Sequence, residues 1–135
     1  MSSEKPKILI LDDEPIVGDR LKPALEKCGY EVETQTDSQA AIDQLAQTRY
    51  DVLITDLKMA GPSGLDVLHS IRQRGHPTQV IIITGYGSME AAREAETVGA
   101  YDFVCKPFEL KDLTKKVKKA AKRARRGVGL PKIEG

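Results

Sequence analysis

The sequence has few of the residues that build disulfide frameworks, large aromatic cores or membrane spans. Its 135 residues include no tryptophan, two cysteines and 4% aromatic residues. The longest unbroken aliphatic runs, Ile8–Leu11 and Val80–Ile83, are four residues each, whereas a helix that crosses a bilayer needs roughly 20 apolar residues. Residues 1–7 are polar and contain no apolar stretch of signal-peptide length. These absences argue against a membrane partner and predict a cytoplasmic protein.

The two cysteines show no sign of a metal or disulfide site. Cys28 and Cys105 stand apart, without CxxC spacing or paired histidines, so neither a metal cage nor a disulfide framework is indicated. We expect both to be small buried hydrophobic side chains, as free cysteines usually are. The chain length and the 40% hydrophobic content predict one compact domain.

Charge is divided unequally along the chain. Residues 1–105 carry 10 basic and 17 acidic side chains, a net charge of −7, and residues 106–135 carry 11 basic and 3 acidic, a net charge of +8. Lys115–Arg126 alone contains eight lysines and arginines. We interpret this stretch first as the solvated face of a helix whose apolar stripe packs on the core. Nucleic-acid binding is the main alternative, less favoured because aromatic residues and a base-reading motif are missing.

Five segments rich in β-branched or aliphatic residues alternate with segments of helical spacing. The predicted strands are Lys7–Leu11, Glu31–Gln35, Val52–Thr55, Gln79–Ile83 and Asp102–Cys105. Apolar residues recur at helical intervals after each of them. Strand-then-helix units with inner strands apolar on both faces predict an α/β fold, in which helices cover both faces of a parallel sheet. The alternating Glu31–Gln35 segment is expected at an edge.

Proline and glycine mark the ends of the predicted elements. Pro15 suits the first turn of a helix, but Pro23 falls in mid-helix, where we expect a kink or local break. From Gly127 onward the periodicity is lost, so residues 126–135 are expected to form a flexible tail or the start of a linker.

The chemistry-bearing residues follow the predicted strands. They are Asp12 and Asp13, Asp56, Thr84 and Lys106. In a parallel α/β sheet the strands end at one edge, where ligands bind, so we expect these residues to meet there. Three carboxylates within about 5 Å repel by roughly 3 kcal/mol per pair at an effective dielectric constant near 20. A divalent cation such as Mg²⁺ relieves that repulsion. A carboxylate beside it can act as a nucleophile on phosphorus, helped by a lysine and a hydroxyl.

Four motifs in this order resemble the receiver domain of two-component response regulators. They are LDDEP, DLKM with Gly64 eight residues after Asp56, IIITG, and YDFVCKPF. The resemblance covers about residues 5–125. It implies a (βα)5 flavodoxin-like fold with strand order 2-1-3-4-5. The runs TGYGSMEAA and GAYDF are most similar to the receivers of AAA+ enhancer-binding transcription regulators.

The resemblance also implies roles for the strand-end residues. Asp56 is the expected acceptor of a phosphoryl group from a sensor histidine kinase. Asp13 and Asp56, with the backbone carbonyl of Lys58, are expected to bind Mg²⁺ directly, while Asp12 holds metal-bound water. Lys106 is expected to pair with the acids and then with the phosphoryl oxygens. The protein is then not an enzyme beyond its own phosphotransfer and autodephosphorylation.

The same resemblance implies a conformational switch. Thr84 is expected to move toward the phosphoryl group, and the Phe103 ring to turn inward behind it; Phe103 as an ordinary core residue is the alternative. This change would alter the face formed by the fourth helix, fifth strand and fifth helix, which is expected to contact an output domain or a second copy.

Some residues depart from the family pattern. Ala60 stands where receivers usually have proline, and Pro62 follows two residues later, so the shape of this loop is open. Lys58 and Tyr86 are expected to affect the lifetime of the phosphorylated form.

Other functions fit the motifs less well. A degenerate receiver that acts only as an interaction module is the second choice. An aspartyl-phosphate phosphatase would ordinarily show Asp-x-Asp-x-Thr after the first strand, and a flavodoxin-like cofactor binder would need hydroxyls and glycines in place of Asp12, Asp13 and Glu14.

Overall fold

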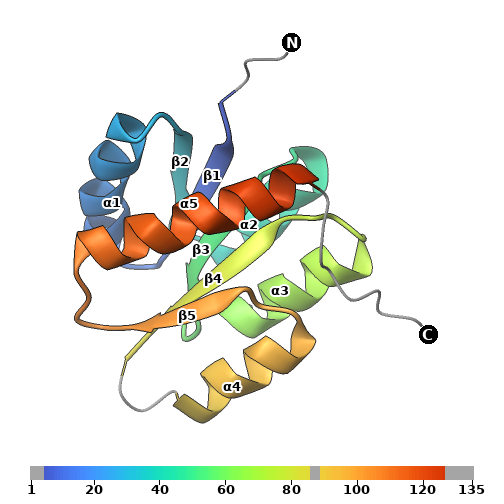
Figure 1. The fold of residues 1–135 in the computed structure, drawn as a ribbon. Coiled ribbons are helices and arrows are strands. Elements are labelled where there is room, and N and C mark those ends of the chain that lie inside the picture. The colour runs from blue at the N-terminus through green and yellow to red at the C-terminus, as the bar shows by residue number, and fades with distance from the viewer. Residues whose placement is uncertain (1–4, 86–88, 127–135) are drawn as a thin grey trace.

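The computed structural model describes residues 5–85 and 89–126 as a single sheet with five helices (Figure 1). The strands are β1 Lys7–Leu11, β2 Glu31–Gln35, β3 Val52–Asp56, β4 Gln79–Thr84 and β5 Asp102–Cys105. The helices are α1 Pro15–Lys27, α2 Ser38–Gln47, α3 Gly64–Gln73, α4 Met89–Val98 and α5 Leu110–Arg126. Strand and helix alternate along the chain, as the hydrophobic pattern predicts.

All strand pairs are parallel, and the sheet has the order β2-β1-β3-β4-β5. In Figure 1, α5 crosses in front of the strands, α1 stands at the left beside β2, and α2 lies behind the strands. One hydrophobic cluster joins α1 and α5 to one face of the sheet. A second joins α2, α3 and α4 to the other. The predicted (βα)5 fold, strand order and two-sided helical cover are confirmed.

Alternation of side chains along the inner strands explains the two clusters. In β1, Ile8 and Ile10 belong to the cluster under α1 and α5, whereas Leu9 and Leu11 belong to the other. All four are at most 1% exposed. Successive side chains of a strand point to opposite faces, so a continuous aliphatic run is what a strand covered on both sides requires. β2 lies at an edge of the sheet and buries fewer residues, as predicted.

Of the kink or local break expected at Pro23, the break is wrong, because α1 continues from Pro15 to Lys27. A proline in mid-helix leaves the carbonyl four residues earlier without its usual donor. Here both Asp19 and Pro23 are exposed. Water can therefore reach the unpaired carbonyl, and the buried side chains Leu21 and Leu25 hold the helix on the sheet.

The expectation of buried cysteines is also wrong, because Cys28 and Cys105 are both exposed. Cys28 caps the end of α1, and Cys105 ends β5, which is an edge strand of the sheet. Neighbouring apolar residues in the sequence do not bury a side chain that stands at the end of an element.

The predicted C-terminal tail and the predicted absence of a membrane span have different outcomes. Residues 127–135, most of the predicted tail, lie outside the described residues. Among the helices that the structure describes, none combines the length and apolar character that a membrane crossing demands.

Candidate functional site

Strand register gathers the predicted site residues at the carboxyl edge of the sheet. Asp56 of β3 pairs with Ile83 of β4, next to Thr84, and Thr84 pairs with Cys105 of β5, next to Lys106. The backbone N–H of Lys106 donates to the Thr84 carbonyl at 2.7 Å. Parallel strands that end level with one another therefore bring residues about 20 to 50 positions apart to one place.

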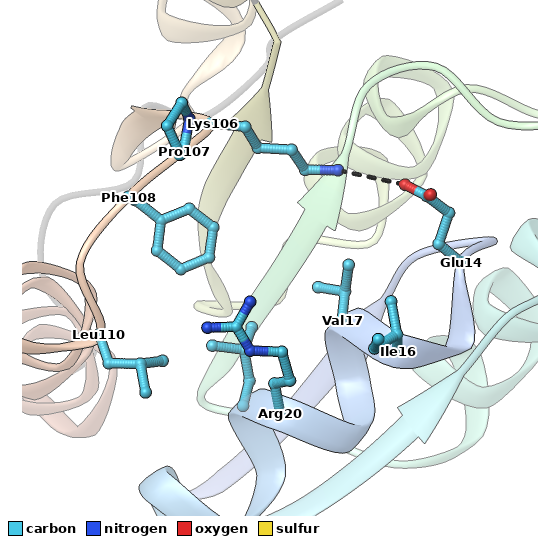
Figure 2. A pocket seen from close by; sticks show the side chains of 9 residues that line it. Glu14, Ile16, Val17, Arg20, Lys106, Pro107, Phe108 and Leu110 are labelled. Atoms are coloured by element: carbon cyan, nitrogen blue, oxygen red, sulfur yellow. Dashed lines mark ion pairs between the residues drawn. The ribbon is translucent and has the colours of Figure 1, made fainter.

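Lys106 lies between the acidic side chains. Its Nζ is 2.9 Å from Asp56 Oδ2 and 3.4 Å from Asp12 Oδ2. It also forms an ion pair with Glu14 Oε1 at 3.7 Å (Figure 2). Sequence reasoning gave Glu14 no role in the site, although it is the third acidic residue of the LDDEP motif and the signal was present. The three contacts make Lys106 the centre of the charge cluster.

Burial and charge shift the protonation equilibria of this cluster. Asp12 is 3% exposed. Burial raises its pKa above the ordinary value, and the hydrogen bond from the Glu14 N–H and the nearby Lys106 only partly offset this. Burial also disfavours the Lys106 ammonium, but its hydrogen bond and attraction to Asp56 outweigh that cost, and the pKa of Lys106 is raised. Lys106 is therefore held cationic beside the two carboxylates.

Two of the three carboxylates that the sequence predicts to meet, Asp12 and Asp56, contact Lys106, and among the described contacts the third carboxylate at Lys106 is Glu14 rather than Asp13. Asp12 is buried and its Oδ1 accepts the Glu14 backbone N–H at 2.9 Å, whereas Asp13 is exposed. Within residues 5–85 and 89–126, no group of three or more His, Cys, Asp and Glu side chains lies close enough to hold a metal ion. The side chains of the adjacent residues Asp12 and Asp13 differ in burial, and the sequence alone does not predict which of the two is buried. The repulsion between Asp12 and Asp56 is relieved by Lys106.

The donor set still suits a hard divalent cation. Asp12 and Asp56 each direct an oxygen to one cationic centre, the Lys106 ammonium. Mg²⁺ is commonly bound through one or two carboxylates and keeps several waters. Lys58 is exposed and its backbone N–H donates to Asp56 Oδ1 at 3.3 Å, which places this loop beside the same carboxylate. The residues present therefore fit Mg²⁺.

The loop after Asp56 depends on Gly64. A Cβ at this position would lie 2.2 Å from the Asp56 backbone oxygen, which no other residue can accommodate without displacing the backbone. The Gly64 N–H donates to the Leu57 carbonyl at 2.9 Å. Earlier in the loop the Ala60 carbonyl accepts a hydrogen bond from Ser38 Oγ. The loop is thus closed by glycine and by Ser38, with Ala60 where receivers usually have proline.

Thr84 and Phe103 lie on neighbouring strands, β4 and β5, and differ in burial. Thr84 is fully buried, and its hydroxyl donates to the Gly85 carbonyl at 3.3 Å rather than to the acidic cluster. The Phe103 ring is half-buried and packs against the cluster under α2, α3 and α4. Tyr86 lies outside the described residues.

A pocket of about 220 Å³ opens beside Lys106, between α1 and the start of α5. Figure 2 shows its walls, with Ile16, Val17 and Arg20 on α1 facing Phe108 and Leu110. Ile16 is 63% exposed, and among the described residues no other large hydrophobic side chain is exposed. A concave site with apolar walls and a few charged groups is the usual form of a binding site.

Comparison with known proteins gives one consistent family. The family model described as "Response regulator receiver domain" matches residues 8–118. The chain is 35% identical over 104 residues to the transcriptional regulatory protein QseB of Escherichia coli O157:H7, covering 77% of this chain and 48% of that protein. It is 35% identical over 114 residues to the regulatory protein AtoC of Escherichia coli K12, covering 84% and 25%. The chain thus spans half or less of the length of these relatives.

Solved structures agree in fold. A response regulator receiver domain protein from Clostridium thermocellum has 34% identity and a TM-score of 0.82, covering 91% of this chain and 99% of that one. The receiver domain of the Francisella response regulator 1452 has 28% identity and a TM-score of 0.81, covering 88% and 98%.

Proposed function

The chain belongs to the family of response regulator receiver domains of two-component systems, and on this premise we propose that it accepts a phosphoryl group on Asp56 from the phosphohistidine of a sensor kinase. Receiver domains are signalling proteins without a dedicated catalytic function and interact with sensor histidine kinases and output domains. We further propose that the output is that of an AAA+ enhancer-binding regulator and that the protein is cytoplasmic. The receiver would cover residues 5–125, followed by a tail or the start of a linker over residues 126–135.

The contact between Lys106 Nζ and Asp56 Oδ2 at 2.9 Å carries the proposal. An Asp56 carboxylate oxygen attacks phosphorus, the new P–O bond forms as the P–N bond to the donor imidazole breaks, and the imidazole leaves with the bond's electron pair. The cationic Lys106 lies where it can neutralise charge on the transferring oxygens. Before transfer, the same ammonium holds Asp56 in place and screens it from Asp12.

Mg²⁺ is generally bound at this position in receiver domains. In this chain Asp13, Asp56 and the Lys58 carbonyl would hold it, with Asp12 acting through water. When bound, it would neutralise charge on the phosphoryl oxygens. Asp13 is exposed and adjacent to the buried Asp12, so it is accessible to an ion arriving from solvent. Its role as a direct ligand remains a prediction.

Phosphorylation would be read through Thr84 and Phe103. The added phosphoryl group brings about −1.5 to −2 charges and strong hydrogen-bond acceptors. In this structure the Thr84 hydroxyl donates a long hydrogen bond, 3.3 Å, to the Gly85 carbonyl. After phosphorylation it would turn toward the phosphoryl oxygens. The space it leaves would be filled by the half-buried Phe103 ring, changing the α4-β5-α5 face that an output domain or second copy contacts. Lys58 and Tyr86 would then tune the lifetime of the phosphorylated form.

The pocket of Figure 2 is the proposed docking surface for the phosphohistidine-bearing donor protein. It shares Lys106 and Glu14 with the acidic cluster, so a protein seated there places its phosphohistidine near Asp56. Ile16 offers the exposed apolar surface that a transient protein contact uses.

Labelling the protein with acetyl phosphate, with and without Mg²⁺, tests the proposal. We expect a Mg²⁺-dependent, hydroxylamine-labile phosphoryl group, measured by intact mass, that is lost in Asp56→Asn. Asp43→Asn makes the same chemical change at an exposed aspartate of α2 and should leave labelling intact. Equal labelling of wild type and Asp56→Asn would refute Asp56 as the acceptor.

A degenerate receiver that acts only as an interaction module is the second candidate. The filled acid, lysine and hydroxyl positions speak against it. Complete absence of labelling with acetyl phosphate and with a phosphohistidine donor, in protein that binds Mg²⁺ and is folded, would favour it.

A further inference from the structure

Basic side chains from three separate segments gather at the end of the molecule opposite the acidic cluster. Lys5 and Lys7 lie at the start of β1, and Arg49 lies in the turn before β3. They line one hollow together with Arg125 of α5. Arg125 also lines a second hollow with Lys118 and Lys122. We call these six residues the basic end.

The basic end carries more positive charge than the nearby acids balance. Glu31 and Asp51 are the acidic residues that line the two hollows. Lys7 pairs with Glu31 at 3.4 Å and with Glu33 at 3.8 Å, and Asp51 pairs with Arg125 at 3.3 Å. Three acidic residues therefore face six basic ones. Lys118 and Lys122 are exposed and form no salt bridge within residues 5–85 and 89–126.

Packing of α5 does not require this charge. The helix is held to the sheet by its apolar stripe, which includes Leu113, Val117 and Ala120. Like charges four residues apart on a helix, such as Lys118 and Lys122, destabilise it. The arrangement therefore costs stability in the free protein, and an anionic ligand would relieve that cost. Lys5, Lys7 and Arg49 come from other segments and lie beside α5. The basic surface is therefore larger than the solvated face of a single helix.

The surface suits the phosphate backbone of a duplex better than a membrane. An amphipathic helix enters a membrane interface through an apolar face, but the apolar stripe of α5 is buried against the sheet. Ile16, the exposed large hydrophobic residue of the described chain, belongs to the pocket beside Lys106 rather than to the basic end. Electrostatic contact with phosphates needs no apolar insertion and no base-reading side chain.

Two other partners fit less well. Single-stranded nucleic acid is bound largely by stacking on exposed aromatic side chains, and Tyr30, the aromatic residue that lines the second hollow, is half-buried. A second copy would have to dock its acidic carboxyl edge on the basic end. Because the two surfaces are different, such a contact is head-to-tail and leads to a ring or an open filament of copies rather than a two-fold symmetric dimer.

The dimensions of α5 match a duplex backbone. From Lys118 to Arg125 the helix extends about 10 Å, a length that covers about three phosphates of one strand at their axial spacing of about 3.4 Å. We propose that the basic end binds the phosphate backbone of duplex DNA without base specificity, through Lys118 and Lys122 of α5 together with Lys5, Lys7 and Arg49. This inference does not rest on phosphorylation of Asp56.

Fluorescence anisotropy with a labelled, mixed-sequence duplex of about three helical turns tests the proposal on the full chain. We expect binding that weakens steeply with salt between about 50 and 200 mM. The charge reversal Lys118→Glu with Lys122→Glu should weaken binding at least about tenfold at about 0.1 M salt and lower the slope of log affinity against log salt by about 1.8, because two phosphate contacts are lost.

The matched control is Lys22→Glu with Arg93→Glu, which makes the same change of charge at exposed positions of α1 and α4. It should change the affinity less than threefold. A far-ultraviolet circular dichroism spectrum and a thermal unfolding curve that match wild type show that the fold of each variant is intact. Equal losses in both double variants would mean that only net charge matters, and the proposal would be overturned. Binding to vesicles rich in phosphatidylserine with no binding to the duplex would also overturn it.

Discussion

The carboxyl and amino edges of the sheet carry opposite charge, and the direction of the helices explains the sign at each edge. At the carboxyl edge Asp12 and Asp56 surround Lys106, whereas at the amino edge Lys7 and Arg125 lie among further cations. In a (βα)5 fold the helices begin near the carboxyl edge and end near the amino edge. Their dipoles therefore favour anions at the first edge and cations at the second, by roughly 0.3–1 kcal/mol per charge near a helix end.

The edges differ in burial as well as in sign. The Asp12 side chain is 2% exposed and that of Asp56 is 16% exposed, whereas that of Arg125 is 41% exposed. Exposed charges are screened by salt, and buried ones much less. The acidic edge can therefore hold a precise local arrangement for chemistry, while the basic edge supplies a salt-sensitive attraction over a wider surface.

Gly64→Ala is expected to disrupt the acidic edge most strongly. The new Cβ would lie 2.2 Å from the Asp56 backbone oxygen, so the loop that carries the acceptor has to move. We expect a loss of about 3 kcal/mol in the free energy of unfolding, measured by urea denaturation. Gly85→Ala is the control, because a Cβ there meets nothing within 4 Å. Similar stability of the two variants would contradict the close contact at Gly64.

Arg72→Met tests the amino edge, where a buried cation is held by backbone carbonyls. Arg72 donates to the carbonyls of Thr78 at 3.1 Å and Gly99 at 2.8 Å, and burial lowers its pKa to about 10. The variant leaves these carbonyls unpaired, and we expect it to lose about 2 kcal/mol of stability. Arg74→Met, at the exposed end of α3, should lose less than about 0.5 kcal/mol. Equal thermal stability of both variants would show that the buried contacts contribute nothing.

Most of this architecture could be predicted from the sequence, because it depends on patterns that are local along the chain. Aliphatic runs such as Ile8–Leu11 identify strands covered on both faces, and parallel strands place their final residues at one edge. The convergence of Asp12, Asp56 and Lys106 follows from those two facts. The family match to residues 8–118 agrees with them.

Features that depend on side-chain direction could not be predicted. Whether Asp12 or its neighbour Asp13 is buried is decided by the turn after β1, in which Asp12 accepts the Glu14 N–H. The exposure of Cys28 reflects its place at the end of α1. The basic end depends on bringing Lys5 and Arg49 next to α5, and no window of sequence contains that contact.

Lys106→Gln compares a buried charge cluster with a surface ion pair. It removes the cation between Asp12 and Asp56, and we expect a loss of about 1.5 kcal/mol at pH 7 in EDTA. Because the folded-state pKa of Lys106 is raised, its stabilising contribution is complete below pH 10.5 and is lost as the pH rises through the raised value. Lys116→Gln breaks the more exposed pair with Asp102 and should cost no more than about 1 kcal/mol. A larger loss for Lys116→Gln would reverse the comparison.

Asp12→Asn is expected to stabilise the protein while weakening Mg²⁺ binding. Burial raises the folded-state pKa of Asp12 above 3.8, so folding disfavours its charged form, and stability is lost as the pH rises through the raised value. Asparagine keeps an acceptor for the Glu14 N–H but carries no charge. In EDTA we expect the free energy of unfolding of the variant to match that of wild type below about pH 3.8 and to exceed it by about 1 kcal/mol at pH 7.

Added Mg²⁺ should narrow that difference in stability, because it stabilises wild type more than the variant. Asp43→Asn makes the same chemical change at an exposed position and is the matched control. If Asp12→Asn is less stable than wild type at pH 7, the ion pair with Lys106 outweighs the cost of burying the carboxylate. The charge on Asp12 would then stabilise the folded state, contrary to this prediction.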